Sequence, residues 1–398
     1  MTILGFIGII LGFLAISVAF TRPTRAKVCY LTLIYLMHVA VSVVYYWRAQ
    51  VNVADSAMYY YDPLGTYEDG FGLGTQAIIY ITQAIKTSVG GTYLDFYLLF
   101  QPIGFLGICV LLRAFEEIYD ELRLPHSVYL YALVAIPSLH FWSSALGKDT
   151  PFLLAVSLAL WASMRLPSRA KALLAAVLLM LLIRPHVALV AVAALSLAVV
   201  VGRGIPLYLR VALFIVAAAG SGVAATAIES TYAIDVTSSE SIGQQFERRD
   251  NVLQSDEAGN SAVSASFPIR LLSLLFRPFF FDADEPFALV ASFESAFVIY
   301  IVLFMLLRWR EVWRLFRSVF FVRYALIYAF GLTIFLTLSY WNVGLGLRQK
   351  WSMLMPTYFV LFVAVLAVRL AKKRSAEGLV LAPSLAYPPA AAQTRTAV

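Results

Sequence analysis

One acidic, aromatic stretch of this 398-residue chain holds the side chains best suited to chemistry: residues 51–74, which read VNVADSAMYYYDPLGTYEDGFGLG. The stretch lies between two long apolar segments and carries Asp55, Asp62, Glu68 and Asp69. A carboxylate held near a membrane surface can accept a proton from a hydroxyl group or bind a metal ion. Aspartate is also common in turns and at helix ends, so a structural role for these aspartates stays open.

Basic residues that follow or interrupt apolar segments form a second group: Lys148 in SSALGKDT, Arg184 in LLIRPH, Arg277 in LLFRPFFF, and Arg348 and Lys350 in GLGLRQK. A single basic residue in such a place is commonly an anchor to lipid headgroups. Its repetition on one predicted side of the membrane favours a shared anionic ligand, because guanidinium groups match phosphate oxygens with two parallel hydrogen bonds. We therefore predict that this group binds a substrate phosphate.

Two further residues are candidates for acid–base catalysis. His186 lies at a turn between two apolar segments, and its imidazole is the second choice as a general base after a loop carboxylate. Glu294 lies about two turns into an apolar segment, where an ionisable side chain is a functional candidate by default. We expect Glu294 to pair with Arg277 or Arg348.

Two other polar residues are predicted to be structural. Asp149 precedes Thr150 and Pro151 at the start of an apolar segment, and this pattern is typical of a helix N-cap. His140 lies deeper in the preceding apolar segment, where we expect a hydrogen-bonded core side chain.

The elements that must position all these residues are membrane helices. The chain is 61% hydrophobic and only 13% charged, with a mean hydropathy of +0.81, whereas a soluble domain is about half apolar and about a quarter charged. The net charge of +7 would suit nucleic acid, but its distribution follows the rule that basic residues collect on the cytoplasmic side.

The apolar segments predict an all-α integral membrane protein, a polytopic bundle of about 11 transmembrane helices over residues 1–373. The basic residues near the span ends place the N-terminus outside and the C-terminus in the cytoplasm of a bacterial inner membrane. The outer loops are then residues 47–93 and 229–286, and residues 374–398 are expected to be a disordered cytoplasmic tail.

Several segments need separate interpretation. Residues 74–89 are apolar on one side only, which predicts an interfacial helix in the first outer loop. Residues 127–142 and 151–164 are short for full spans. Residues 342–350, NVGLGLRQK, are predicted to form the outer turn before the last span.

Motifs for several common kinds of chemistry are missing from the sequence. It has no Walker loop, no dinucleotide-binding fingerprint, no Cys/His cluster and no Gly-x-Ser-x-Gly elbow. Its two cysteines, Cys29 and Cys109, lie in apolar segments, and we interpret them as small hydrophobic residues. We therefore predict no metal site and no established cofactor, while the carboxylate-rich loop leaves a divalent cation open.

At these residues the chain resembles bacterial polysaccharide polymerases of the EpsG-like and Wzy type and, more distantly, the GT-C membrane glycosyltransferases. The resemblance rests on DSAMYY, FWSSALGKDTPFLLAVSLALW, LLIRPH, FRPFFF and NVGLGLRQK. It implies a GT-C-like bundle that uses sugars carried on polyprenyl phosphates or pyrophosphates at the outer face. Asp55 would then activate the acceptor, and Arg184, Arg277 and Arg348 would face the lipid phosphate. Many GT-C enzymes carry the catalytic loop after their first span, whereas here it follows the second predicted span.

The sequence therefore favours a membrane glycosyltransferase that polymerises lipid-linked repeat units in exopolysaccharide or O-antigen assembly. Its expected partners are a polyprenyl-linked sugar or oligosaccharide, membrane lipids and other polysaccharide-assembly proteins, with no nucleic acid. A transporter or flippase for lipid-linked saccharides is the alternative, because it also needs an arginine-lined cavity but no reacting carboxylate. A membrane acyltransferase, which would rely on a histidine, is the third.

Overall fold

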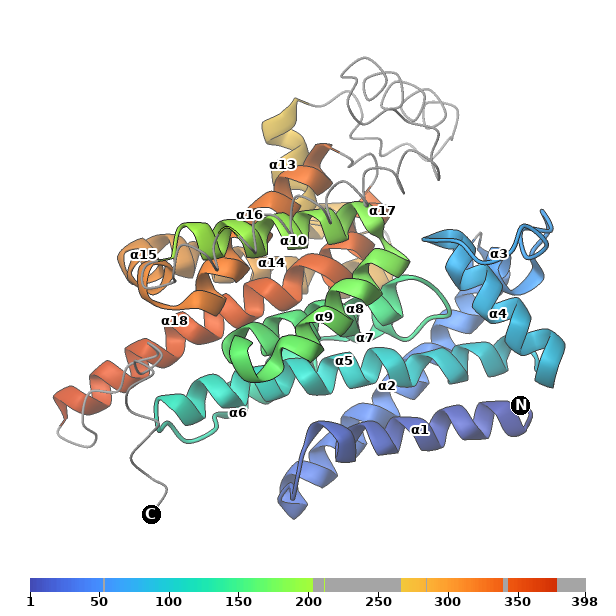
Figure 1. Ribbon diagram of the computed structural model, residues 1–398, viewed down its shortest axis with the longest axis horizontal. Helices are drawn as coiled ribbons and strands as arrows, with labels where there is room; N and C mark the ends of the chain where they lie inside the picture. Colours follow the sequence, from blue (N-terminus) through green and yellow to red (C-terminus); the bar gives the residue numbers. More distant parts are fainter. Residues whose placement is uncertain (53, 203–210, 212–265, 284, 339–342, 378–398) are drawn as a thin grey trace.

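The regular elements of this protein are helices throughout the part that the structure, a computed structural model, describes (Figure 1). That part comprises residues 1–52, 54–202, 211, 266–283, 285–338 and 343–377. Nearly all of the predicted span 211–228, all of residues 229–265 and residues 378–398 lie outside it. The prediction of a helical membrane protein is confirmed for the described residues.

Six of the described helices are long and apolar enough to cross a membrane. They are α2 (Arg25–Val51), α5 (Tyr93–Glu121), α9 (Leu166–Ile183), α14 (Pro286–Leu307), α16 (Phe320–Leu338) and a continuous helix, Gly344–Ala376. Shorter apolar helices are α1 (Ile3–Ala19), α8 (Asp149–Met164), α10 (Pro185–Val200) and α13 (Phe267–Phe276). The expected number of about 11 spans is not confirmed, because these four are shorter than the roughly 20 residues that a perpendicular span needs.

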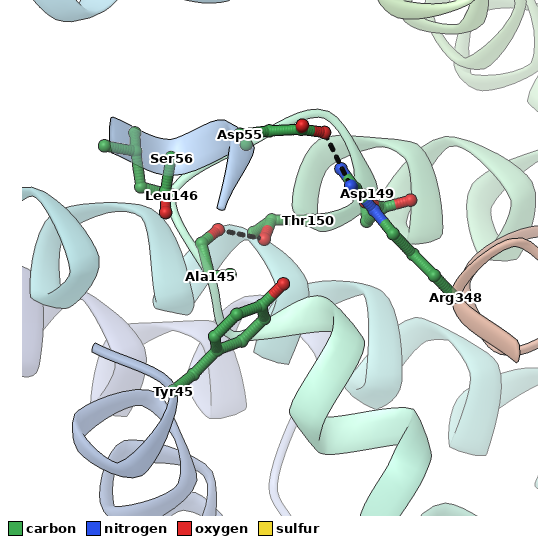
Figure 2. Close-up of a pocket in the computed structure, with 9 residues that line it drawn as sticks. Tyr45, Asp55, Ser56, Ala145, Leu146, Asp149, Thr150 and Arg348 are labelled. Atoms are coloured by element: carbon green, nitrogen blue, oxygen red, sulfur yellow. Dashed lines mark hydrogen bonds and ion pairs between the residues drawn. The ribbon is translucent and has the colours of Figure 1, made fainter. Parts of the chain in front are cut away.

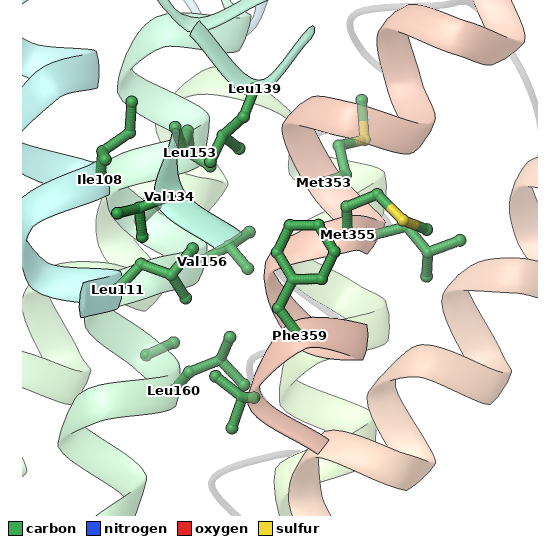
Figure 3. Close-up of a cluster of buried hydrophobic side chains, with 14 of the residues drawn as sticks. Ile108, Leu111, Val134, Leu139, Leu153, Val156, Leu160, Met353, Met355 and Phe359 are labelled. Carbon is green, nitrogen blue, oxygen red and sulfur yellow. The ribbon is translucent and has the colours of Figure 1, made fainter. Parts of the chain in front are cut away.

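The core forms around α5, which is buried along most of its length and packs against α1, α2 and α8. Glycines allow the backbones to approach closely: a Cβ atom added at Gly8 of α1 would lie 2.0 Å from the carbonyl oxygen of Leu98. Figure 3 shows Ile108 of α5 and Leu153 of α8 on one side of the cluster, facing Phe359 of α18 (Met355–Ala376) on the other. These three helices thus form the framework that positions the residues at their ends.

Ion pairs join the helices at one end of the bundle. The Lys27 Nζ atom at the start of α2 lies 2.6 Å from the Glu116 carboxylate near the end of α5. Close by on α5, Glu117 binds Arg165 at 2.6 Å and Arg169 at 2.9 Å. The opposite end of the bundle carries α3 (Asp55–Tyr61) and α4 (Thr75–Val89), on the right of Figure 1.

Two predicted segments differ from the structure. The segment 127–142 is not one helix but two, α6 (Val128–Val134) and α7 (Pro137–Ser143), because proline removes a backbone donor and cannot continue the first helix. The prediction of an outer turn over 342–350 is wrong, since α17 (Val343–Gln349) continues through a π-helical turn, η2 (Lys350–Leu354), into α18.

Three further elements complete the described structure, and the first of them was predicted as a helix. The one-sided apolar segment 74–89 is a helix, α4, which packs on α3 and α9. The basic aromatic segment that follows α14 is α15 (Trp309–Ser318), a helix with arginines and tryptophans on its surface. A short 3₁₀ turn, η1 (Phe280–Asp282), lies between α13 and α14.

The close approach of α5 to the chain after α7 generates a prediction. A Cβ atom at Gly104 would lie 1.9 Å from the carbonyl oxygen of Ser143, and this backbone cannot move without displacing residues 144–148. We expect Gly104→Ala to destabilise the protein by about 1–3 kcal/mol through overpacking, measured as thermal unfolding in detergent micelles. Gly331→Ala is the control, because its new Cβ atom would lie 3.3 Å from the side chain of Val190. Equal unfolding temperatures for the two variants would contradict this account of the packing.

Candidate functional site

A small pocket opens where the C-terminal part of α2, the start of α3, residues 145–150 and Arg348 of α17 meet (Figure 2). Its empty space, including the open mouth, is about 240 Å³. Polar side chains dominate the lining: Tyr45, Asp55, Ser56, Asp149, Thr150 and Arg348. Figure 2 shows the carboxylates of Asp55 and Asp149 on either side of the Arg348 guanidinium.

Asp149 is the buried centre of the site. Its carboxylate accepts hydrogen bonds from Arg184 Nη2 at 2.7 Å, from Ser352 Oγ at 2.9 Å and from Arg348 Nε. Only 5% of Asp149 is exposed. The prediction that Asp149 caps a helix is wrong: Lys148 is the N-cap of α8, and the described hydrogen bonds of the Asp149 carboxylate come from side chains and not from backbone N–H groups. Because two guanidinium groups surround it, its role is electrostatic.

The helical turn at the start of the last span brings Arg348 and Ser352 to the same carboxylate. These residues are four positions apart, and the Ser352 hydroxyl also donates to the Arg348 carbonyl oxygen at 2.8 Å. On a helix such positions lie on one face. The turn between them is π-helical, a form that often occurs at functional sites. A loop over residues 342–350 would not have given this alignment.

Asp55 occupies the open side of the same cluster. Its carboxylate lies 2.6 Å from Arg348 Nη1, and 47% of its side chain is exposed, against 7% for Asp149. Asp55 is the first residue of α3, after the N-cap Ala54, and the described hydrogen bond of its carboxylate comes from Arg348 and not from a backbone N–H group. The cap role that sequence left open for it is therefore absent.

Asp62, by contrast, is a turn residue. It adopts a left-handed backbone conformation with φ of 45°. Its carboxylate accepts hydrogen bonds from the backbone N–H groups of Thr66 at 2.9 Å and Tyr67 at 2.8 Å. Aspartate is favoured in such turns for this reason. Two aspartates of the same loop thus have separate roles, and Asp62 offers a natural control for Asp55.

Two buried polar atoms beside Asp149 lack hydrogen-bond partners among the described residues. They are Arg184 Nε and the Tyr59 hydroxyl oxygen. Buried polar groups nearly always have a partner, so each is free to bind a water molecule or a ligand. Arg184 is only 7% exposed, which means that a ligand reaching it would be largely shielded from solvent.

Lys148 contributes a third positive charge. Its ammonium group donates a hydrogen bond to Thr75 Oγ1 at the start of α4, at 2.9 Å. Burial lowers the pKa of Lys148 to about 8, and the nearby charge of Arg184 acts in the same direction. Lys148 is therefore mostly charged at pH 7. With Arg184 and Arg348 it gives three positive charges against two carboxylates, so the group carries a net charge of 3 − 2 = +1.

The predicted residues Arg277, Glu294 and Lys350 lie outside this pocket, around the end of α13. Lys350 is fully buried and donates to the carbonyl oxygens of Leu275 at 3.2 Å and Arg277 at 2.9 Å. It also contacts Ser295 Oγ at 3.4 Å. These bonds engage its three N–H groups with the protein. Lysine at a helix C-terminus stabilises the free carbonyl groups there.

Arg277 and Glu294 also have partners of their own. Arg277 binds Asp282 through two hydrogen bonds of 2.9 Å, and these bonds hold the pKa of Asp282 below its usual range. Glu294 accepts a hydrogen bond of 2.8 Å from the backbone N–H of Ser138. The expected ion pair between Glu294 and Arg277 or Arg348 does not occur among the described contacts.

His186 begins the first turn of α10, two residues after Arg184. Its ring stacks on Phe335, with 5.4 Å between the ring centroids. It does not line the pocket. Of the eight predicted site residues, the structure therefore brings four together around Asp149: Asp55, Lys148, Arg184 and Arg348.

Two negative findings complete the description of the site. Within the described residues, no three His, Cys, Asp or Glu side chains are grouped so that they could hold a metal ion. No protein-family model, curated protein or solved structure matches the chain. The function of this chain must therefore be inferred from the geometry of the pocket.

The burial of the Asp149–Arg184 pair generates a prediction. Asp149→Ala leaves Arg184 buried without its counter-charge, so we expect a loss of about 3–5 kcal/mol in stability, much of which the double variant Asp149→Ala/Arg184→Ala recovers. Unfolding of the purified protein in micelles measures this coupling. Glu285→Ala is the control, because it breaks an exposed pair with Arg48 and should cost less than about 1 kcal/mol. Additive effects of the two pocket substitutions would show that the pair is not coupled.

Proposed function

We propose that this protein is a membrane glycosyltransferase that acts on sugars carried by a polyprenyl phosphate or pyrophosphate. A polymerase of repeat units for exopolysaccharide or O-antigen is the form that we favour. The observation that carries the proposal is the cluster around Asp149. A half-exposed carboxylate, Asp55, binds Arg348, which also binds Asp149. Arg184 binds the same Asp149, and the ammonium group of Lys148 is close enough to feel these charges. Transfer of a sugar from a phosphate needs both kinds of group.

The cationic side chains suit the leaving group. When the anomeric carbon–oxygen bond breaks, negative charge develops on the departing phosphate, and fixed cations in a water-poor site stabilise that charge. Arg184 has its Nε atom free of partners among the described residues, and Lys148 adds an ammonium group that burial leaves mostly charged at pH 7. Both are already held in place, so little reorganisation is needed.

Asp55 suits the acceptor. As the acceptor oxygen forms its bond to the anomeric carbon, its hydroxyl proton must leave, and a carboxylate within hydrogen-bonding reach can take it. Asp55 is the exposed carboxylate of the pocket. His186 is the second choice and lies outside the pocket lining.

Arg348 connects the two roles. Its Nε atom is bound by the buried Asp149, whereas its Nη1 atom is bound by the exposed Asp55 at 2.6 Å. A phosphate group that enters the pocket competes with Asp55 for Nη1, because both are oxygen anions that accept charge-assisted hydrogen bonds. In the proposed mechanism substrate binding therefore frees Asp55 for the acceptor, while Asp149 keeps Arg348 in place.

The location that fits this function is a bacterial inner membrane with the pocket on the outer face. We propose about 11 spans in a GT-C-like bundle, with the N-terminus outside and the C-terminus inside. The support is the distribution of charge: Lys27, Arg165 and Arg169 lie at the end of the bundle opposite α3 and α4. Basic residues are typical of cytoplasmic ends.

Reporter fusions test this orientation. We expect fusions within residues 51–74 and 229–270 to report an external location and fusions within 308–323 to report the cytoplasm. The reason is that the predicted outer segments have few basic residues near the span ends, while residues 308–323 are rich in arginine. Cytoplasmic reporter activity at residue 240 would reverse the pocket to the inner face and contradict the proposed reaction.

The alternative, a transporter or flippase of lipid-linked saccharides, is supported less well by the charges. A carrier binds its cargo near the middle of the membrane, whereas the pocket lies where α2 ends and α8 begins. A carrier also has no need for a free carboxylate beside the phosphate-binding group. The substitution that separates the two functions is therefore one that removes the charge of Asp55.

Asp55→Asn is this decisive variant. The amide keeps the size of the side chain but cannot accept the acceptor's proton, so we expect product formation to fall by about a hundredfold or more. The measurement is the lipid-linked product or polymer made by purified protein from a polyprenyl-diphosphate-linked saccharide. Asp62→Asn is the matched control, because it removes the same charge from a residue that holds a turn. The amide keeps one of the two oxygens that accept from Thr66 and Tyr67, so we expect a cost of about 1 kcal/mol in stability. Near-wild-type turnover of Asp55→Asn would show that Asp55 is not the general base. An equal loss of product formation in both variants would indicate a structural role for the loop.

A further inference from the structure

Two histidines face each other inside the bundle, away from the pocket. His38 on α2 and His140 on α7 are both fully buried, and their Nδ1 atoms lie 2.9 Å apart. The other nitrogen of each ring faces a backbone carbonyl oxygen: His38 Nε2 lies 3.0 Å from Gln101 O, and His140 Nε2 lies 2.8 Å from Val134 O. All three separations are hydrogen-bond distances.

His140 must donate from Nε2. Val134 is the last residue of α6, and the helix cannot supply donors for its carbonyl oxygen beyond the break. Three residues on, Pro137 has no N–H group. Four residues on, the N–H of Ser138 donates to Glu294 instead. The proton on His140 Nε2 is therefore the donor that satisfies the Val134 carbonyl oxygen.

His38 cannot satisfy both of its contacts if the two rings are neutral. A neutral imidazole carries one proton. With that proton on Nε2 of His38, the Nδ1 atoms of both rings face each other with lone pairs at 2.9 Å. With it on Nδ1, the Nε2 lone pair faces the Gln101 carbonyl oxygen at 3.0 Å. Three contacts need three protons, and two neutral rings supply only two.

We propose that the His38–His140 pair is a proton-binding site. It takes up one proton from the solvent, which is held between the two Nδ1 atoms, so the pair carries three N–H groups and a single positive charge. Burial of a charge is costly. Here two carbonyl oxygens accept from the pair, and the Phe105 ring, whose centroid lies 5.7 Å from that of His38, adds an aromatic contact.

The bound proton stabilises the contact between α7 and α2. The Ser42 hydroxyl of α2 makes a second link of 2.8 Å to the carbonyl oxygen of Ser144, just after α7. The residues that follow, 145–147, 149 and 150, line the pocket. Without the shared proton the facing lone pairs would push α7 away from α2. The proton therefore holds the segment that carries Lys148 and Asp149, whatever the chemistry of the pocket proves to be.

The other titratable and charged groups on the packed elements have separate partners. On α2, the Tyr35 hydroxyl donates to Ile9 O and accepts from Gln101 Nε2. The Tyr45 ring stacks on Phe141 of α7.

The charged groups on the other packed elements are also engaged elsewhere. Glu294 of α14 accepts from Ser138 N. Lys350 of η2 donates to carbonyl oxygens of α13 and its C-terminus. Asp149 of α8 binds the two arginines. The described contacts of the two rings therefore include no carboxylate.

Nitrogen-15 NMR of the histidine-labelled protein in lipid bilayers, at a pH of about 7.5, counts the protons directly. The chain has four histidines, so a His126→Gln/His186→Gln background leaves the two rings of the pair as the labelled ones. We expect three of their four ring nitrogens to be protonated and a nitrogen–nitrogen correlation between the two Nδ1 atoms. Two protonated nitrogens, one per ring, would overturn the proposal.

His140→Asn is the matched variant. Its side-chain amide nitrogen takes the place of Nδ1 and donates to His38 Nδ1 without carrying a charge. We expect His38 in this variant to be neutral, with its proton on Nε2, and to lose the correlation. A doubly protonated His38 would overturn the proposal, because the extra proton would not then depend on the second ring. If the background or the variant fails to fold, the wild-type chain decides the question: His38 Nε2 must be protonated while the Nδ1–Nδ1 correlation is present, and an unprotonated His38 Nε2 would overturn the proposal.

Discussion

The interaction on which the candidate site depends is the buried carboxylate of Asp149 between two guanidinium groups. It joins the start of α8 to Arg184, between α9 and α10, and to Arg348 of α17. These residues are 35 and 199 positions away from Asp149 in sequence. A charge buried in this way is stable only when it is paired. Removal of the carboxylate would leave Arg184 buried without its counter-charge, which would weaken the packing of these helices at this end.

Arg348 binds a second carboxylate, and this second ion pair makes the cluster a candidate binding site as well as a structural contact. Asp149 is buried and holds the Nε side of the Arg348 guanidinium, whereas Asp55 is half-exposed and holds the Nη1 side. The difference in exposure means that the outer bond can be exchanged at low cost, since an exposed ion pair contributes little stability. The bond between Arg348 and the buried Asp149 cannot be exchanged at low cost. Arg348 is thus fixed in position but able to change its outer partner, and a site for an anionic substrate needs both properties.

The sequence could predict the class of fold and part of the site, but not the contacts that organise the site. Hydropathy identified the membrane helices because it depends on composition alone. The basic residues Arg184 and Arg348 could be identified because positive charge is unusual beside apolar segments on the side predicted to be external. The local sequence around Asp149 matches the pattern of a helix cap, whereas the partners that determine its role are far away in sequence. An excess of buried positive charge was the available signal that a buried anion must lie nearby.

Two kinds of error have the same physical origin. Residues 342–350 were expected to form a turn, yet burial of Lys350 and Trp351 extends the last helix through them, and tertiary packing of this kind overrides local propensity. Lys350 and Glu294 were expected to act on substrate, yet both bind backbone groups. In a membrane protein every freed backbone group needs a partner. A polar residue in an apolar segment can therefore serve the backbone as well as a ligand.

The break between α6 and α7 shows how polar side chains that bind backbone groups help to position the candidate site. Pro137 ends the hydrogen bonding of α6 and leaves the Val134 carbonyl oxygen and the Ser138 N–H without helical partners. His140 satisfies the first and Glu294 the second, from different helices. These bonds, with the links of α7 to α2, hold a seven-residue helix that could not be stable alone. Because α7 leads directly into the residues that line the pocket, the partners recruited by the broken helix also position Lys148 and Asp149.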